Sequence, residues 1–300
     1  MKRVLSLLFA LVFVVAAFPV TVASAADVIE ISDAAQLAAI GTNDNYPLSG
    51  SYKLTKSISL SGYDNWTPIG NGSAFSGTFE GNGKTISGLK VNSSGTYAGL
   101  FGQVTGTVKN LTVTGSVTLN NTSSSATSVY AGLVAGNVGL FGTVDSCSAE
   151  GNVTATLNCS ASSSFLSSPK GNVYAGGVIG NSSSFYEFSE LSHKSGKVIA
   201  TANMTNKGNA FAYAGGVAGK SGATIVDSYN KGDVSATATA SSGETNAYSG
   251  GISGYGKNFA TSYNTGDISA SGITVANAGA IAGYATGKAT NCYYLSGCAT

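Results

Sequence analysis

The chain has few charged residues: 15 lysines and arginines and 14 aspartates and glutamates among 300 residues. This near balance provides no attraction for nucleic acid or for an anionic membrane surface, so we expect neither as a partner. A single histidine excludes a histidine-rich metal centre, and we predict no metal and no cofactor. By contrast, 41 glycines and an apolar content of 43% argue against a disordered chain and favour many turns around a buried core.

Cysteine is also scarce, with four residues and no C-x-x-C pair, which disfavours zinc. In an exported chain four cysteines allow three disulfide pairings, and sequence neighbours are the expected partners. We predict a disulfide between Cys292 and Cys298 that staples the C-terminal end, and a second one between Cys147 and Cys159.

Residues 1–25 have the pattern of a secretory signal peptide. Lys2 and Arg3 precede an apolar run over residues 4–17, and small residues lead up to Ala25. The apolar run is short for a bilayer span, so a membrane anchor is the weaker alternative. We predict cleavage after Ala25, export of the mature chain and no membrane insertion.

An internal repeat dominates the rest of the chain. The motif begins with a tyrosine, a small residue and a glycine, continues with an aliphatic residue and ends with a second glycine. Its copies start 29 to 44 residues apart. The copies are Tyr97–Gly102, Tyr130–Gly136, Tyr174–Gly180, Tyr213–Gly219, Tyr248–Gly254 and Asn277–Gly283.

The repeat has the period of short strands. Runs of β-branched and aromatic residues alternate with serine, threonine and asparagine, and no helical period is sustained. Strands this short gain stability by stacking in parallel coils around one core. We therefore predict an all-β fold, a right-handed parallel β-helix (β-solenoid), over residues 52–300. A β-propeller is disfavoured because its blades need longer strands and a more constant period.

Residues 26–51 are predicted to form an N-terminal cap. Asp33 is a good N-cap residue, Gln36 follows three residues later, and Gly41 suits the helix end. We expect a short helix from Asp33 to Ile40 that covers the open end of the strand stack, and a first coil at residues 52–60.

Two columns of side chains follow from aligning the copies. The first is a tyrosine column, interpreted as a structural ladder in preference to a platform that presents ring faces to glycans. It consists of Tyr97, Tyr130, Tyr174, Tyr213 and Tyr248. The second is predicted to point inward, and consists of Leu111, Cys147, Leu191, Tyr229, Tyr263 and Cys292.

No catalytic set is apparent. Glu187 and Glu190 come nearest to a carboxylate pair but lie in an irregular insertion, and His193 has no evident acidic partner. Asp233 and Asp267 follow equivalent glycines; we interpret them as turn residues rather than as calcium ligands. We predict no catalytic residue and no enzymatic activity.

Three segments resemble the GLUG-motif repeats of bacterial surface and secreted proteins: Trp66–Gly70, Phe75–Leu89 and Gly99–Gly102. The resemblance extends over about Ile29 to Leu295. Because that family includes adhesin-like proteins and the non-catalytic part of some IgA-specific metallopeptidases, it implies a surface-associated repeat module. The His-Glu-x-x-His motif of such peptidases is missing, so no catalytic residue is carried over.

These observations predict a non-catalytic extracellular adhesion or ligand-binding module of a secreted or surface-associated bacterial protein. Its expected partner is a glycan or a host or cell-surface protein. Two alternatives stay open. Polysaccharide lyases and hydrolases also use β-helices, so a carbohydrate-active enzyme is one. The other is a purely structural spacer in a larger surface assembly.

Overall fold

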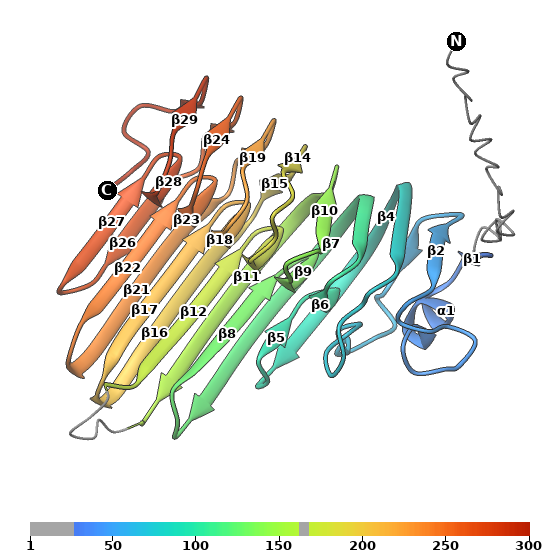
Figure 1. The fold of residues 1–300 in the computed structure, drawn as a ribbon, viewed down its shortest axis with the longest axis horizontal. Helices are drawn as coiled ribbons and strands as arrows, with labels where there is room; N and C mark the ends of the chain where they lie inside the picture. Colours follow the sequence, from blue (N-terminus) through green and yellow to red (C-terminus); the bar gives the residue numbers. More distant parts are fainter. Residues whose placement is uncertain (1–26, 162–167) are drawn as a thin grey trace, which may run out of the picture.

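The computed structural model describes residues 27–161 and 168–300, so the predicted signal peptide lies outside the described residues. Strands lie side by side along the length of the molecule, from β1 near the N-terminal end to β27 at the C-terminal end (Figure 1). The described part contains a single α-helix, α1 (Ala34–Ala39), at the N-terminal end of the stack. The all-β prediction is confirmed.

The strands belong to four sheets. The large sheet has 14 strands: β1 (Val28–Ile31), β2 (Ser51–Leu54), β3 (Ile58–Ser59), β4 (Thr78–Ser93), β7 (Thr107–Ser123), β10 (Thr143–Asp145), β11 (Ser148–Cys159), β15 (Ser192–Ser195), β16 (Lys197–Lys207), β20 (Tyr229–Asn230), β21 (Asp233–Ser242), β25 (Tyr263–Asn264), β26 (Ile268–Ser271) and β30 (Tyr293–Tyr294).

Three smaller sheets complete the fold. The tyrosine sheet contains β5 (Tyr97–Ala98), β8 (Thr127–Gly132), β12 (Lys170–Gly176), β17 (Asn209–Gly215), β22 (Thr245–Gly250) and β27 (Val275–Gly279). The third sheet contains β6 (Phe101–Val104), β9 (Ala135–Val138), β13 (Ile179–Ser182), β18 (Ala218–Ser221), β23 (Ser253–Gly256) and β28 (Ala282–Ala285). The fourth contains β14 (Phe188–Ser189), β19 (Ile225–Val226), β24 (Phe259–Ala260) and β29 (Ala289–Thr290).

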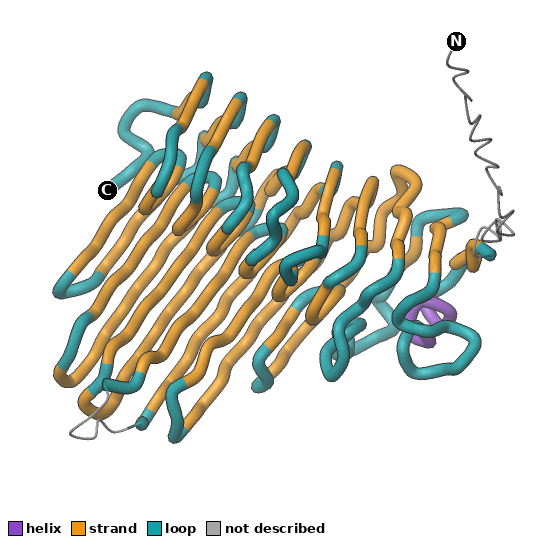
Figure 2. Tube along the Cα trace, viewed as in Figure 1, coloured by secondary structure: helices purple, strands orange, loops and turns teal. Residues whose placement is uncertain are grey.

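Each strand pairs with its counterpart in the preceding and following repeats. In β12, for example, Tyr174 is in register with Tyr130 of β8 and with Tyr213 of β17. We call each such repeat a coil. The paired strands of the described residues are parallel, which is consistent with a β-helix and not with the antiparallel blades of a propeller. Figure 2 shows these strands stacked side by side and joined by loops.

The core lies between the sheets and consists of columns of like side chains. One column has a β-branched residue in five successive coils, each at most 1% exposed: Val117, Val153, Val198, Val234 and Ile268. Side chains on a strand alternate between faces, so identical register from coil to coil places the same position inward each time. The repeat in the sequence thus becomes a continuous apolar interior.

The N-terminal end is closed by the predicted helix. Asp33 is its N-cap, with Oδ1 accepting the backbone N–H of Gln36 at 2.8 Å, and Ile40 is its C-cap. Leu37 of the helix is fully buried against the core. The helix prediction over Asp33 to Ile40 is confirmed. The sequence reasoning missed β1, which precedes the helix and pairs with β2.

The corners of the coils have special backbone conformations. A column of non-glycine residues has positive φ, including Asn110 (54°), Ser146 (48°) and Thr261 (46°). At a second corner Gly151 has φ 136°, and a Cβ there would lie 1.8 Å from the carbonyl oxygen of Gly115 in the preceding coil. Only glycine fits this corner, because the two backbones touch.

The predicted disulfides are not formed: all four cysteines are free thiols. Cys147 and Cys159 are not paired: Cys147 directly precedes β11 and Cys159 is its last residue. The straight segment from Val153 to Cys159 alone spans roughly 20 Å, far beyond disulfide reach. The pairing of Cys292 with Cys298 is also absent, since Cys298 Sγ instead accepts a hydrogen bond from Asn264 Nδ2 at 3.6 Å.

The predicted inward column is wrong at two of its members. Leu111, Cys147 and Leu191 are buried, but Tyr229 is in register with Ser192, one residue further along, and Tyr263 stacks on Tyr229 on the outer surface. The inward positions belong to the preceding serines, Ser228 and Ser262, which are 1% and 0% exposed. A slip of one residue moves a side chain to the other face of a strand.

Candidate functional site

The tyrosine column is continuous in the structure. Strand register aligns the five residues, and successive ring centroids lie 4.9 to 5.4 Å apart with interplanar angles of 5° to 12°. The column comprises Tyr97, Tyr130, Tyr174, Tyr213 and Tyr248. In the next coil Asn277 occupies the same register position as Tyr248, so the ladder ends there.

This stacking decides between the two interpretations of the column. Tyr130, Tyr174 and Tyr213 each have a neighbouring ring on both faces, and Tyr174 is only 9% exposed. A sugar ring that stacks on tyrosine needs a free ring face. The inner rings offer none, so the geometry supports the structural ladder. Only ring edges and phenol groups remain for a ligand.

The ladder also affects the acidity of its phenols. Burial, with a smaller contribution from Tyr248, raises the pKa of Tyr213 to about 12. Burial likewise raises the pKa values of Tyr97, Tyr174 and Tyr248. At neutral pH these four tyrosines present uncharged hydroxyl groups, which both donate and accept hydrogen bonds.

A second outward column lies beside the ladder on the third sheet. Asn181 Nδ2 donates to Asn137 Oδ1 at 2.7 Å, and Lys220 Nζ lies 5.9 Å from the ring of Tyr174 and 5.4 Å from that of Tyr255. Tyr255 also meets Tyr213 edge-on at 6.1 Å. The column is Gln103, Asn137, Asn181, Lys220, Tyr255 and Tyr284.

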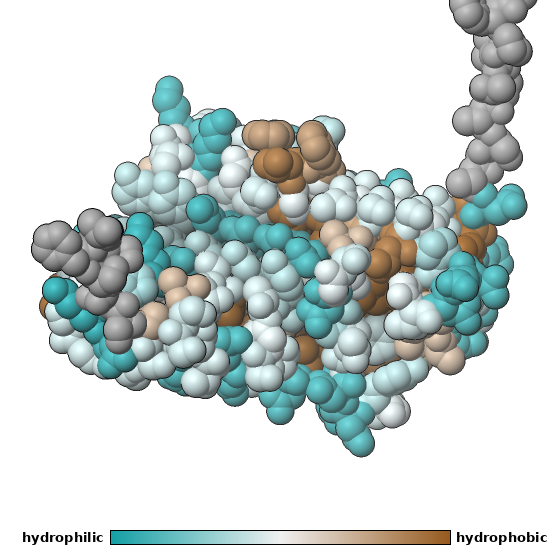
Figure 3. Space-filling model, turned by 60° about the horizontal axis from the view of Figure 1, so that its bottom comes forward, coloured by the Kyte–Doolittle hydropathy of each residue, from teal (hydrophilic) through white to brown (hydrophobic). Residues whose placement is uncertain are grey.

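We call these two columns the tyrosine face. Its groups are phenols, amides and ring edges, and Lys220 is its single charged residue. The tyrosine face therefore offers many weak neutral contacts in a regular array. Figure 3 shows one side of the molecule, on which hydrophilic and near-neutral residues predominate and apolar residues gather in a few patches.

The interior of the C-terminal coils contains a second, buried ladder of polar groups. Asn230 Nδ2 donates to Asn264 Oδ1 at 2.7 Å, and both residues are fully buried. His193 Nδ1 lies 2.8 Å from Asn230 Oδ1, and its Nε2 lies 3.0 Å from the carbonyl oxygen of Gly151. Each asparagine also bonds the backbone of the glycine two residues on. These partners satisfy groups that would otherwise be costly to bury.

Glycines make room for this amide ladder. A Cβ on Gly177 would lie 2.5 Å from His193 Cγ, and one on Gly216 would lie 2.2 Å from Asn230 Cγ. In the earlier copies the same motif position is Leu100 or Leu133, and the residue in register with His193 is Ala149. Where the repeat motif changes from Gly-Leu to Gly-Gly, the core therefore changes from apolar side chains to hydrogen-bonded polar ones.

The candidate catalytic residues do not meet. His193 is buried in the amide ladder, whereas Glu190 is exposed at a corner and accepts a hydrogen bond from Ser146 Oγ at 2.9 Å. Glu187 is exposed on a loop. Asp233 is the first residue of β21 rather than a turn residue, and its Oδ1 accepts the backbone N–H of Asp267 in the next coil at 3.3 Å. Among the described residues, no group of three or more metal-ligating side chains occurs.

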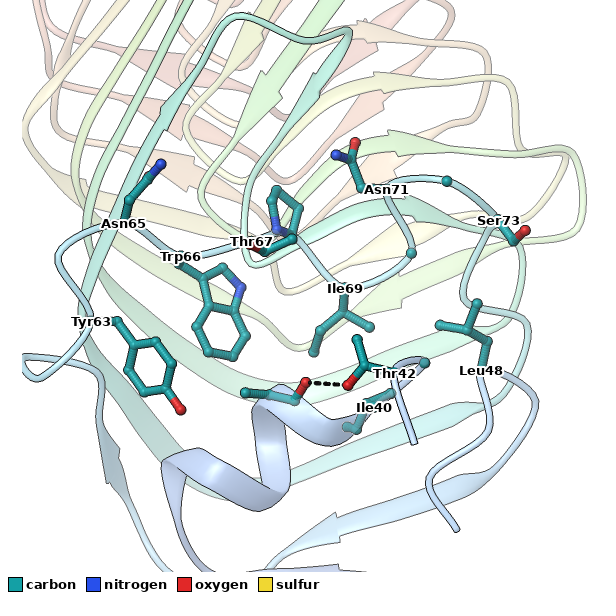
Figure 4. A pocket seen from close by; sticks show the side chains of 15 residues that line it. Ile40, Thr42, Leu48, Tyr63, Asn65, Trp66, Thr67, Ile69, Asn71 and Ser73 are labelled. Carbon is teal, nitrogen blue, oxygen red and sulfur yellow. Dashed lines mark hydrogen bonds between the residues drawn. The ribbon is translucent and has the colours of Figure 1, made fainter. Parts of the chain in front are cut away.

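A pocket of about 440 Å³ lies between the end of α1 and the loop that follows β3. In Figure 4 Ile40, Ile69 and the indole of Trp66 line its centre, and Tyr63 stands at one side. Two of its polar side chains bond the backbone: Trp66 Nε1 donates to the carbonyl of Leu100 at 3.1 Å, and Thr42 Oγ1 to that of Ala38 at 3.1 Å. Tyr63 Oη donates to the carbonyl of Ala34 at 3.3 Å and so joins the cap to the segment after β3. We therefore assign the pocket a structural role.

The one helix of the described residues, α1, is too short to cross a membrane, and no other candidate span occurs in that part of the chain.

Comparison with known proteins supports the architecture. No protein-family model matches the chain, and no curated protein matches it. Among solved structures, the crystal structure of "a putative immunoglobulin A1 protease from Bacteroides ovatus" matches with a TM-score of 0.53 and 20% identity. The match covers 89% of this chain and 75% of that chain. At this identity the similarity concerns the fold, and the resemblance to GLUG-motif repeats stays a prediction.

Proposed function

We propose that the chain is a non-catalytic extracellular adhesion or ligand-binding module built on a right-handed parallel β-solenoid. The observation that carries the proposal is the tyrosine face: phenols and amides in register along the stack, without a convergent set of acid, base, nucleophile or metal ligands among the described residues. A catalytic site needs different functional groups close together at one point, whereas the tyrosine face repeats the same phenols and amides from coil to coil.

The proposed location rests on the sequence. Residues 1–25 have the basic, apolar and small-residue segments that export requires. A fold shared with a protein titled as an immunoglobulin A1 protease is compatible with this, since repeat modules accompany many activities. We therefore place the mature chain outside the cell, secreted or attached to a surface.

The proposed partner is a glycan or a host or cell-surface protein. Phenol hydroxyls and asparagine amides bond neutral hydroxyl and amide groups, and the face carries too little charge to select an ionic ligand. When the ligand itself is repetitive, one weak contact holds its neighbouring units near the next binding positions at high local concentration. The affinities of the individual contacts then combine. A polymeric or densely displayed ligand therefore fits this face best.

The test is a binding array of glycans and extracellular-matrix proteins probed with the mature chain. The informative variant is Tyr130→Phe, Tyr174→Phe and Tyr213→Phe together, which removes the hydroxyls but keeps the stacked rings. We expect at least about tenfold weaker binding, as for the loss of several hydrogen bonds of about 0.5–1.5 kcal/mol each.

The matched control is Tyr229→Phe with Tyr263→Phe, which removes hydroxyls from the other stacked pair, on the large sheet. Its binding should equal that of the wild type. Absence of any ligand on the array would favour the structural spacer. Depolymerisation of a polysaccharide by the purified chain would favour the carbohydrate-active enzyme.

A further inference from the structure

The turns that follow the third sheet differ in length among the six coils. In four coils two or three residues fill this turn, as at 105–106 after β6 and at 222–224 after β18. In two neighbouring coils it has four residues, 139–142 between β9 and β10, and five residues, 183–187 between β13 and β14. Strands β9 and β13 pair with each other inside the sheet and lie midway along the stack in Figure 1. We call these two long turns the aromatic turns.

The aromatic turns present large apolar side chains to solvent. Leu140 and Phe141 of the first turn are 47% and 69% exposed. Phe185 and Tyr186 of the second turn are 76% and 50% exposed. Elsewhere in the described residues, large apolar side chains are this exposed only in the first strand and in the last coil. A group of exposed apolar side chains on a soluble protein marks a binding surface.

Hydrogen bonds hold the two turns against each other. The backbone N–H of Phe185 donates to the carbonyl of Leu140 at 3.2 Å, which places the turns side by side. Ser184 is 1% exposed, and its Oγ accepts the backbone N–H of Tyr186 at 3.0 Å. Phe188, directly after the second turn, is fully buried. The exposed side chains are therefore carried on an ordered backbone, so little backbone entropy is lost when a ligand binds.

The three rings of the aromatic turns have free faces. Phe141, Phe185 and Tyr186 make no contact with another ring or with a cation among the described residues. The inner tyrosines of the ladder, by contrast, cover one another's faces. The apolar C–H face of a sugar ring packs well against such a free aromatic face. Tyr186 Oη and the Glu187 carboxylate have no hydrogen-bond partner among the described residues, and so are available to sugar hydroxyls.

Charge and size favour a glycan without acidic groups over other ligands. Neither turn contains a lysine or an arginine, and Glu187 ends the second turn. Asp145 and Glu190 each lie three residues beyond one of the turns, so the surroundings repel polyanions and anionic lipid surfaces. A folded protein partner needs about 20–30 residues a side, whereas the flanking turns at 105–106 and 222–224 are short and add no large apolar side chain.

We propose that the aromatic turns bind a polysaccharide without acidic groups, with Phe141, Phe185 and Tyr186 stacking on its sugar rings. Glu187 and the Tyr186 hydroxyl then bond sugar hydroxyls at the edge of the site. This site is distinct from the tyrosine face, which presents hydroxyls and amides while its inner ring faces are covered. The proposal rests on the proposed extracellular function only in that an exported chain meets glycans.

The experiment is native electrophoresis of the mature chain in gels that contain galactomannan, xyloglucan, laminarin, arabinoxylan or polygalacturonate. We expect at least one of the four neutral polysaccharides to retard the chain, and the acidic polygalacturonate to leave its mobility unchanged. The disrupting variant is Phe141→Ala with Phe185→Ala, which removes two of the three rings. We expect its dissociation constant, measured from the retardation at increasing polysaccharide concentration, to be at least about tenfold higher.

Tyr293→Ala with Tyr294→Ala is the matched control, because it removes two exposed rings from the last coil. It should be retarded like the wild type, and circular dichroism should show that all variants keep the fold. A wild-type chain that no neutral polysaccharide retards overturns the proposal, as does equal retardation of the Phe141→Ala, Phe185→Ala variant.

Two further measurements separate this site from other ligands and from the tyrosine face. Binding of the wild type, but not of the Phe141→Ala, Phe185→Ala variant, to phosphatidylcholine vesicles in place of the neutral polysaccharides would assign the turns to lipid and overturn the proposal. The variant with Tyr130→Phe, Tyr174→Phe and Tyr213→Phe should keep its full retardation, because it leaves the aromatic turns intact. Loss of retardation in that variant alone would place the polysaccharide on the tyrosine face instead, so either proposal can fail without the other.

Discussion

The first coils and the later coils fill the same interior with opposite chemistry. In the first coils Leu100 and Leu133 occupy the motif position, and the buried residues in the register of His193 are the apolar Val113 and Ala149. In the later coils that position is glycine, and His193, Asn230 and Asn264 occupy the space with hydrogen-bonded polar groups. Parallel strand pairing continues across this change, with one register shift directly after Ala149. The backbone thus tolerates either filling, provided that both partners change together.

We expect the largest loss of stability when a core glycine is replaced and its polar neighbour is kept. We expect Gly216→Leu to lower the free energy of unfolding by more than about 4 kcal/mol, because a Cβ there would lie 2.2 Å from both Asn230 Cγ and the carbonyl oxygen of Gly251. Urea denaturation measures this. Adding Asn230→Ala recreates the Leu133 and Ala149 combination and should recover part of the loss. A double variant no more stable than the single one would show that the exchange is not pairwise.

Removing one amide from the later coils should have the next largest effect. Asn230→Ala removes one hydrogen-bond partner each from His193, Asn264 and the backbone of Gly232 in a fully buried site. We expect a loss of about 2–4 kcal/mol by thermal or urea denaturation. The control is Asn181→Ala, which removes a similar amide–amide bond from the outer surface and should lose no more than about 1 kcal/mol, since water replaces the partner.

The tyrosine ladder runs through both regions and allows them to be compared directly. Tyr174→Ala removes a ring stacked on both sides and should destabilise by about 3 kcal/mol. Tyr97→Ala removes an end ring stacked on one side and should lose about half as much. Equal losses in melting experiments would contradict a role for stacking.

Alkaline pH should weaken the ladder. The folded pKa of Tyr213 is about 12, above its ordinary value of 10, so the unfolded chain releases its proton first. The contribution of this residue is complete below pH 10 and is lost as the pH rises towards 12. We expect the free energy of unfolding to fall over this window, and Tyr213→Phe to make the fall shallower. A pH-independent stability from 10 to 12 would contradict the burial of these phenols.

We expect the smallest change in stability from substitutions at the positive-φ corners of the coils. Asn110, in the first coils, suits a positive φ, whereas the β-branched Thr261 adopts φ 46° in the later ones. Thr261→Asn makes the later corner resemble the earlier one and should stabilise by about 0.5–1 kcal/mol. Asn110→Thr is the reverse exchange and should destabilise by a similar amount in the same denaturation assay.

The sequence predicts features that the repeat motif marks directly. The tyrosine register, the parallel stacking and the helix with its Asp33 cap follow from local patterns that tertiary packing does not override. The inward column was wrong at Tyr229 and Tyr263 because their strands reverse the usual rule: tyrosine faces outward, and Asn230 and Asn264 face inward. Alternation shows that successive side chains point to opposite faces of a strand, but not which residues point inward. Hydrophobicity was used to choose the inward residues.

The disulfide predictions failed for a related reason. Sequence proximity between Cys147 and Cys159 suggests a short loop, yet the intervening residues form one extended strand. Nor does the sequence alone show that Gly177 faces His193 in the core. The signal lies in two positions that change together: leucine and alanine in one copy become glycine and a polar residue in the next. Finding it requires an alignment of both halves of each repeat.

The ladder also has an optical consequence. Its rings are nearly parallel and about as close as stacked rings come, so light absorbed by one tyrosine migrates readily to the next. The only tryptophan of the chain, Trp66, bonds the carbonyl of Leu100, three residues from the first ring. Excitation energy that passes along the ladder is therefore emitted by a single tryptophan near the N-terminal end. Tyr63, outside the ladder, also lies 5.3 Å from Trp66 and transfers energy to it. The part of the tyrosine-excited emission that is lost on Tyr97→Ala thus reports, without any added label, on the connection of the column.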